Sequence, residues 1–206
     1  MTQARPYAGV DAADRSARRR SRLLESGLEL LGSNIDPAEL TVRGICQQAG
    51  LATRYFYEGF QDKDGFIGAV FDWVIAQLAT TTQAAVAVAP AQQQTRAGLT
   101  NIVRTIEGDP RIGRLIFGAQ VSNTAVIRKR HETEALFVML AGQHVENLTQ
   151  QPATEATKAF SYFVVGGVTQ TISAWLAGDV VLTSAELVDQ LSAIVDTFGE
   201  SSLFRG

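Results

Sequence analysis

The residues of this sequence best suited to chemistry are Arg54, Tyr55 and Tyr57, which stand together in the segment TRYFYEGF. Phe56 and Phe60 are four residues apart, so in a helix they share one face, which we expect to be buried. At about 100° per residue, Arg54 then points away from the core and the two tyrosines lie on the flanks. Guanidinium and phenol groups on an exposed helix can hydrogen-bond to phosphates and to base edges in a DNA major groove. The segment predicts a DNA-recognition helix, although core packing and a solvated arginine explain the same residues when the segment is taken alone.

A second short helix is expected just before this one. Thr41 is a suitable N-cap, because its hydroxyl can accept a hydrogen bond from an amide of the first turn. Gly50 ends the helix, since glycine adopts a positive φ without a Cβ clash. Between them, apolar residues recur at helical spacing at Val42, Ile45, Cys46 and Ala49. Two short helices joined by a glycine turn form a helix-turn-helix, and this context favours DNA recognition over plain core packing.

Residues 41–63 resemble the DNA-binding half of the TetR family of one-component bacterial regulators. The matching positions are Thr41-Val42-Arg43, Ile45, Ala49-Gly50-Leu51, Tyr57, Phe60 and Lys63, after an arginine- and leucine-rich helix. The length of 206 residues and the helical pattern of the remainder also match the family layout. The resemblance implies phosphate contacts and base or backbone contacts along this motif. The expected DNA-binding residues, including two from the upstream helix, are Arg18, Arg19, Thr41, Arg43, Thr53, Arg54, Tyr55, Tyr57 and Lys63.

The recognition segment departs from the family pattern at Glu58-Gly59, where many members have Arg-Tyr, and at Gln61, where a proline is usual. A carboxylate facing DNA repels phosphate, but it can accept a hydrogen bond from a cytosine amino group. It can instead pair with Arg54, four residues earlier on the helix. Both alternatives stay open, so the operator of relatives cannot be transferred to this chain.

The net charge of −3 by itself argues against a nucleic-acid binder, but the charges are unevenly distributed. Residues 15–63 hold eight basic and six acidic side chains, whereas residues 64–206 hold nine and thirteen. Much of the positive charge lies in a run of arginines at positions 15, 18, 19, 20 and 22. Such a run is usually solvated, but beside a helix-turn-helix it can follow phosphates or a minor groove.

The hydrophobic spacing predicts an all-α fold and shows no useful strand alternation. We expect residues 1–63 to form a three-helix DNA-binding domain with a basic N-terminal arm, and residues 64–206 to form a helical effector-binding and dimerisation domain. A cap at Asp36-Pro37 precedes the helix-turn-helix, and Asp62 caps a long helix towards Val88 that ends at Ala89-Pro90. The other expected helices span residues 15–32, 91–107, 110–121, 124–150, 152–178 and 184–203.

The last two helices are candidates for a homodimer interface. Apolar residues recur at three- and four-residue steps on both: Phe160, Val164, Val168, Ile172 and Trp175 on the first, and Leu187, Leu191, Ile194 and Phe198 on the second. The core of a monomer explains the same pattern. A dimer is favoured because tight operator binding usually uses two half-sites, and because TetR relatives pair through a four-helix bundle of these segments.

By resemblance, the middle helices enclose a small-molecule effector pocket. The candidate residues are polar or aromatic side chains on otherwise apolar faces: Trp73, Arg114, Phe117, Gln120, Phe137, His144 and Gln170. Each one, taken singly, is also compatible with core or surface, and Arg114 suits either an anionic ligand or a surface salt bridge. An effector that favours a conformer unable to bind DNA would release the operator by a population shift.

The competing functional classes have little support. His131 and His144 are the only histidines, and neither has metal-ligand spacing to another His or to Cys46, so we expect no metal, no cofactor and no enzyme activity. An architectural or co-regulatory helical protein with weak or non-specific DNA binding remains the alternative.

Residues 159–178 lack charge but contain several Ser, Thr and Gln side chains, which favours a buried helix over a membrane span. With no signal peptide visible and with Cys46 on an apolar face, we expect a cytoplasmic protein.

Overall fold

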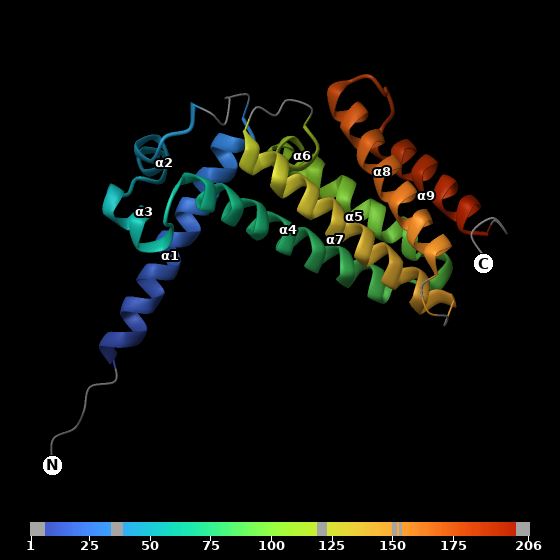
Figure 1. The fold of residues 1–206 in the computed structure, drawn as a ribbon, viewed down its shortest axis with the longest axis horizontal. Helices are drawn as coiled ribbons and strands as arrows, with labels where there is room; N and C mark the ends of the chain where they lie inside the picture. The colour runs from blue at the N-terminus through green and yellow to red at the C-terminus, as the bar shows by residue number, and fades with distance from the viewer. Residues whose placement is uncertain (1–6, 34–38, 119–122, 150–151, 153, 201–206) are drawn as a thin grey trace, which may run out of the picture.

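The computed structural model describes residues 7–33, 39–118, 123–149, 152 and 154–200, and over these ranges the chain forms helices and no strand. The predicted all-α fold class is confirmed. Three helices gather at one end of the molecule (Figure 1). α1 (Tyr7–Leu31) carries α2 (Val42–Ala49) and α3 (Thr53–Gly59) against it, while its N-terminal part projects away from the other helices.

The local signals that define these helices are present as predicted. The Thr41 hydroxyl accepts a hydrogen bond from the Gly44 amide at 3.0 Å and so caps α2. Gly50 ends α2 with φ at 61°, a left-handed conformation in which glycine avoids Cβ strain. The Asp62 carboxylate accepts from the Gly65 amide at 2.7 Å and caps the next helix.

In the described part of the chain after residue 62, α4 to α9 form a larger helical assembly that packs alongside α1, α2 and α3. α4 (Lys63–Val88) packs against α1, α5 and α7, so it joins the two parts directly (Figure 1). α7 also packs against α8, and α5 against α9. After the short 3₁₀ turn η2 (Ala91–Gln93), the remaining helices are α5 (Gln94–Gly108), α6 (Pro110–Phe117), α7 (Thr124–Thr149), α8 (Glu155–Ala177) and α9 (Ser184–Glu200).

Several helix ends differ from the prediction. α1 begins at Tyr7 rather than Arg15, and α6 ends at Phe117 rather than at residue 121. α6 stops because Gly118 is extended and Arg130 donates hydrogen bonds to carbonyls of its last turn. α8 begins three residues after the expected Pro152, where the Thr154 hydroxyl supplies the cap. The Asp36-Pro37 cap and the expected ends at residues 121, 150 and 203 lie outside the described residues.

A single apolar core runs from Leu23 in α1 to Leu191 in α9. Close approach of α1 and α4 requires Gly27, because a Cβ there would lie 2.5 Å from Val70 Cγ2 and 2.7 Å from Phe66 Cζ. α4 packs against α1 on one side and against α5 and α7 on the other, so one core joins the two expected domains. The division into domains 1–63 and 64–206 stays a prediction. Within the described ranges, no helix has the length and apolarity needed to cross a membrane.

Candidate functional site

The helix α3, which the sequence predicts to be a recognition helix, has the expected buried and exposed faces. Phe56 is fully buried, and its ring lies 5.4 Å from that of Phe60 and 5.3 Å from that of Phe66. This aromatic cluster anchors α3 to the start of α4. On the other side Arg54 is exposed and Tyr57 is 60% exposed, so both are presented to solvent.

Tyr55, for which a DNA contact stays a prediction, interacts with two arginines of its own chain. It is half-buried, and its hydroxyl accepts a hydrogen bond from Arg54 Nη2 at 2.8 Å. The guanidinium carbons of Arg54 and Arg19 lie 4.7 Å and 4.6 Å from the centre of the same ring. Tyr55 therefore orients Arg54 and bridges α3 to α1.

Four other residues around the helix-turn-helix were predicted to contact DNA, and three of them are exposed to solvent. Thr41, Arg43 and Thr53 are exposed, and Lys63 is half-buried at the first turn of α4. Thr41 and Lys63 lie at the N-terminal ends of α2 and α4, where the helix dipole also favours an anion such as phosphate. Contact of these residues with DNA stays a prediction.

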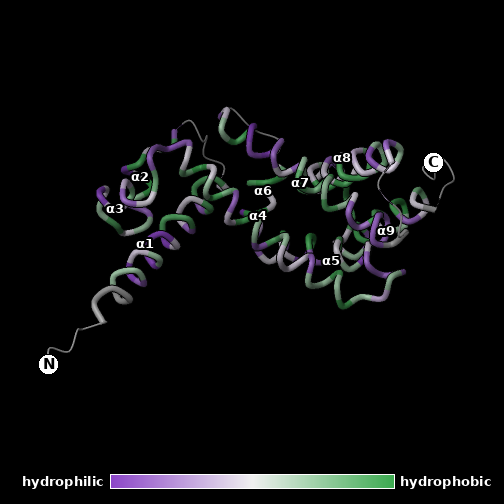
Figure 2. The backbone as a smooth tube through the Cα atoms, turned by 60° about the horizontal axis from the view of Figure 1, so that its bottom comes forward, coloured by the Kyte–Doolittle hydropathy of each residue, from purple (hydrophilic) through white to green (hydrophobic). Residues whose placement is uncertain are grey.

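The arginine run of α1 is largely engaged within the protein, a feature that the sequence analysis missed. Arg19 pairs with Glu58 at 3.3 Å, and Arg20 Nη1 donates to the Gly59 carbonyl at 3.2 Å. Arg22 Nη2 donates to the Ala49 carbonyl at 2.6 Å. Figure 2 shows this hydrophilic stretch of α1 beside α3. These side chains clamp the helix-turn-helix onto α1, whereas Arg18 is exposed. Glu58 thus pairs with Arg19, and the alternative of a Glu58–Arg54 pair is not what the structure shows.

A second set of arginines joins α6 to the end of α1. The Arg111 guanidinium contacts Asp109 at 2.7 Å, Glu29 at 2.6 Å and Glu25 at 3.0 Å. The hydrogen bond from Arg111 holds the pKa of Asp109 below its ordinary value. Arg114 Nε donates to the Gly32 carbonyl. Arg114 lines neither of the two cavities described below, because its side chain is turned towards Gly32 at the end of α1, so its role as a pocket residue stays a prediction.

A cavity of about 540 Å³ lies among α4, α5, α7 and α8. Of the predicted pocket residues, Phe117, Phe137 and His144 line it. Trp73 does not, since it packs against the core instead, and Gln120 lies outside the described residues. Phe160, Val164, Val168 and Ile172, which were predicted to form the dimer interface, line this cavity.

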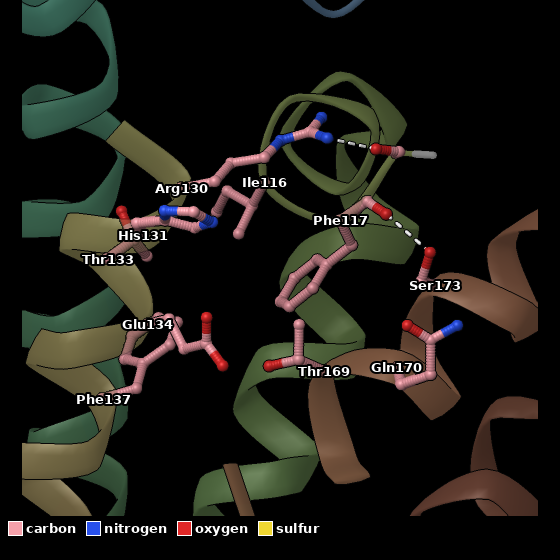
Figure 3. Close-up of a pocket in the computed structure, with 11 residues that line it drawn as sticks. Ile116, Phe117, Arg130, His131, Thr133, Glu134, Phe137, Thr169, Gln170 and Ser173 are labelled. Carbon is pink, nitrogen blue, oxygen red and sulfur yellow. Dashed lines mark hydrogen bonds between the residues drawn. The ribbon is translucent and has the colours of Figure 1, made fainter. Parts of the chain in front are cut away.

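A smaller pocket of about 360 Å³ adjoins the cavity, and Phe117, Phe137 and Thr169 line both (Figure 3). Gln170 lines this second pocket rather than the larger one. Arg130 also lines it, but its guanidinium donates to the carbonyls of Arg114, Leu115 and Gly118. Burial lowers the pKa of Arg130, and these carbonyls of the α6 C-terminus supply its compensating hydrogen bonds.

The predicted dimer-interface residues mostly face inward. Those buried in the protomer's own core are Phe160, Ile172, Leu187 and Leu191, and Trp175 is half-buried with its indole donating to the Leu182 carbonyl at 2.9 Å. These five are packed against their own chain, and their place in an interface stays a prediction. Ile194 and Phe198 are exposed, by 49% and 37%.

The exposed apolar surface of these helices combines Ile194 and Phe198 with two residues of α8 that were not predicted. Tyr162 and Phe163 on α8 are 53% and 57% exposed, and the Phe163 ring lies 5.5 Å from that of Phe198 on α9. Together with Ile194, these residues form what we call the α8/α9 surface. On α8, Tyr162 and Phe163 point away from the buried stripe of Phe160 and Ile172, so the apolar repeat noted in the sequence does not include them.

The described residues contain no group of three or more His, Cys, Asp or Glu side chains arranged to hold a metal ion. Cys46 is buried, and burial raises the pKa of its thiol, which agrees with its interpretation as a small core residue.

No protein-family model and no curated protein sequence matches this chain. Solved structures do. FadR of Bacillus subtilis in complex with stearoyl-CoA has a TM-score of 0.71 at 15% identity, over 85% of this chain and 96% of FadR. FadR of Bacillus halodurans has a TM-score of 0.72 at 13% identity, with 85% and 96% covered. A TetR-like transcriptional regulator from Rhodococcus sp. RHA1 has a TM-score of 0.63 at 13% identity, with 89% and 97% covered.

These likenesses establish the architecture. The chain has the fold of the TetR-like transcriptional regulators, with a helix-turn-helix at one end and a helical assembly around a cavity at the other. The resemblance drawn from residues 41–63 is confirmed at the level of the fold.

Proposed function

We propose that this protein is a transcriptional regulator that binds double-stranded DNA through α3. The observation that carries the proposal is the division of α3 into two faces, with Phe56 and Phe60 buried and Arg54 and Tyr57 exposed. A buried aromatic anchor fixes the position of the helix, while the exposed guanidinium and phenol supply hydrogen bonds for bases and phosphates. The fold shared with known regulators supports the same conclusion.

The proposed functional unit is a homodimer on a palindromic operator. One helix-turn-helix covers a single half-site, so specific binding is strengthened when two are held at a spacing of one helical turn or a multiple of it. The α8/α9 surface supports this, because large apolar side chains on a soluble protein usually mark an interaction site. Phe163, Ile194 and Phe198 are its proposed contacts, with the partner's same surface opposite.

The proposed regulation is release of DNA by a small effector, which makes the protein a repressor. The cavity has a suitable volume and a mostly apolar lining. Two helices connect it to the DNA-binding end: α4, which packs on α1, and α6, where Phe117 lines the cavity while Arg111 and Arg114 contact α1. A ligand that shifts α6 therefore changes the support of α1 and the spacing of the two recognition helices.

Selection of bound sequences from a random duplex pool at near-physiological salt tests the proposal. We expect the wild-type protein to enrich an inverted repeat. Arg54→Ala removes the exposed guanidinium and is expected to lose the enrichment, since a bidentate base contact contributes about 1 to 3 kcal/mol of discrimination. The matched control is Arg104→Ala, which removes an exposed arginine from α5 and should select the wild-type sequence.

Two results would contradict the proposed function as a transcriptional regulator that reads DNA through α3. Binding whose strength depends on salt but not on sequence would instead support an architectural protein. Enrichment that survives Arg54→Ala would mean that another surface reads the DNA.

A further inference from the structure

The lining of the main cavity restricts the charge of its ligand. Among the described residues that line it, none is Lys, Arg, Asp or Glu. The walls are chiefly aliphatic and aromatic, with a few hydroxyl, amide and imidazole side chains. An ionised group placed here loses its hydration and meets no countercharge, which is costly in an apolar setting. The lining therefore favours an uncharged ligand.

The shape of the cavity favours an elongated ligand. On α7 the lining extends from Phe137 to Asn147, about 15 Å at a rise of 1.5 Å per residue. Gln83 and Gln143 are exposed lining residues, so the cavity is open to solvent beside them. Phe117 and Phe137 lie on the border with the smaller pocket.

One polar side chain in the lining lacks a partner. His144 lines the cavity, and its Nε2 atom is buried with no hydrogen-bond partner among the described residues. A buried polar atom without a partner is destabilising, so a ligand group that pairs with it gains affinity. Burial lowers the pKa of His144, so the imidazole is neutral at pH 7 and offers a hydrogen bond rather than a positive charge.

The adjoining pocket does not provide a site for an anionic head group. Its guanidinium, that of Arg130, is occupied by carbonyls of α6 and Gly118. Glu134 lines the same pocket, and Figure 3 shows its carboxylate across from Thr169 and Gln170. A carboxylate or phosphate placed in this pocket would face the Glu134 carboxylate and have to displace the hydrogen bonds of Arg130.

We infer that the cavity binds an uncharged, elongated and mainly apolar molecule whose one hydrogen-bonding group pairs with His144. The inference rests on the ligand-responsive function proposed above and specifies its effector. It is a different class from the stearoyl-CoA bound to Bacillus subtilis FadR, because coenzyme A carries phosphates. A hydroxyl suits the site, since it can donate or accept and so pairs with either tautomer of the imidazole.

Calorimetric titration of the full-length protein with three ligands of equal chain length tests the ligand class. The ligands are 1-decanol, decanoate and decylammonium at pH 7.5, so that the apolar contribution is shared and only the head group differs. We expect 1-decanol to bind at least tenfold more tightly than either ion. Equal or tighter binding of an ion, or no binding of 1-decanol, overturns the inference.

Variants of His144 test the hydrogen bond. His144→Leu is expected to lower the affinity for 1-decanol roughly fivefold, which corresponds to one neutral hydrogen bond. The affinity for 1-chlorodecane should not change. His144→Gln keeps a hydrogen-bonding group and should recover most of the loss. Gln190→Leu, at an exposed position of α9 outside the cavity lining, should have no effect. Equal losses for 1-decanol and 1-chlorodecane, or no loss for either, would exclude pairing at His144.

The ligand and DNA experiments can each contradict one proposal without contradicting the other. If no DNA sequence is enriched while 1-decanol binds as expected, the regulator proposal fails and the ligand class stands. If an operator is enriched but decanoate binds best, the regulator stands and the ligand class fails.

Discussion

Arg19 in α1 and Glu58 in α3 form an ion pair, with 3.3 Å between Nη2 and Oε2. The pair joins the recognition helix to the helix behind it, and Tyr55 stacks beneath the same guanidinium. The negative charge of Glu58 is thus partly neutralised by an arginine of the same chain. On the proposed DNA-binding surface, this pairing reduces the repulsion between Glu58 and phosphates.

We predict that Glu58→Gln strengthens binding to random-sequence DNA. The substitution removes a negative charge beside the phosphates and frees Arg19, so the slope of log affinity against log salt should steepen by about one to two ions. Stability should fall by less than about 1 kcal/mol, because half-exposed ion pairs contribute little. Titrations of one duplex at several salt concentrations measure the slope. Asp179→Asn, in the turn after α8, is the charge-matched control, and an unchanged slope for Glu58→Gln would argue against this role.

Gly27→Ala is predicted to destabilise the protein by about 1 to 3 kcal/mol, because its methyl group overlaps Val70 and Phe66 at the α1–α4 contact. Gly108→Ala is the matched control, since a Cβ at this position in α5 meets nothing within 4 Å. Urea denaturation followed by circular dichroism gives both free energies of unfolding. Equal stability of the two variants would show that α1 and α4 separate at little cost.

Phe163→Asp is predicted to convert a dimer into a monomer. The substitution places a charge in the centre of the α8/α9 surface, where burial against a second copy leaves it unpaired. Sedimentation equilibrium at micromolar concentration measures the change in mass. Val181→Asp is the control, because Val181 is 90% exposed in the turn between α8 and α9. A wild-type protein that is monomeric at high concentration would exclude the proposed dimer.

Asp109→Asn is predicted to lower stability by about 1.5 kcal/mol at pH 7, the contribution of a hydrogen bond between charged groups. The folded protein lowers the pKa of Asp109, so its contribution is present above the ordinary pKa of an aspartate, about 3.9, and is lost as the pH falls below it. The difference in free energy of unfolding between wild type and variant should therefore shrink between pH 5 and pH 3. A difference that does not change with pH would assign the effect to capping of α6 instead.

Much of the helical layout follows from local sequence. The caps at Thr41 and Asp62, the turn at Gly50 and the buried pair Phe56 and Phe60 depend on residues close together in the chain, and all were predicted correctly. Such features are set by hydrogen bonds within one turn and by side-chain spacing along one helix. The direction of the recognition face was predictable for the same reason.

Contacts between distant segments were not predictable in this way. Arg19 and Arg114 have no local partner that would indicate Glu58 or the Gly32 carbonyl. On α8, Ile172 and Phe163 are nine residues apart and so point to opposite sides of the helix, and the sequence does not say which side a neighbouring helix covers. The helices, their caps and the exposed face of α3 could be predicted from the sequence, because they depend on interactions a few residues long. The arginine clamps, the cavity lining and the exposed surface of α8 and α9 became visible only in the folded chain, because each depends on which helices pack together.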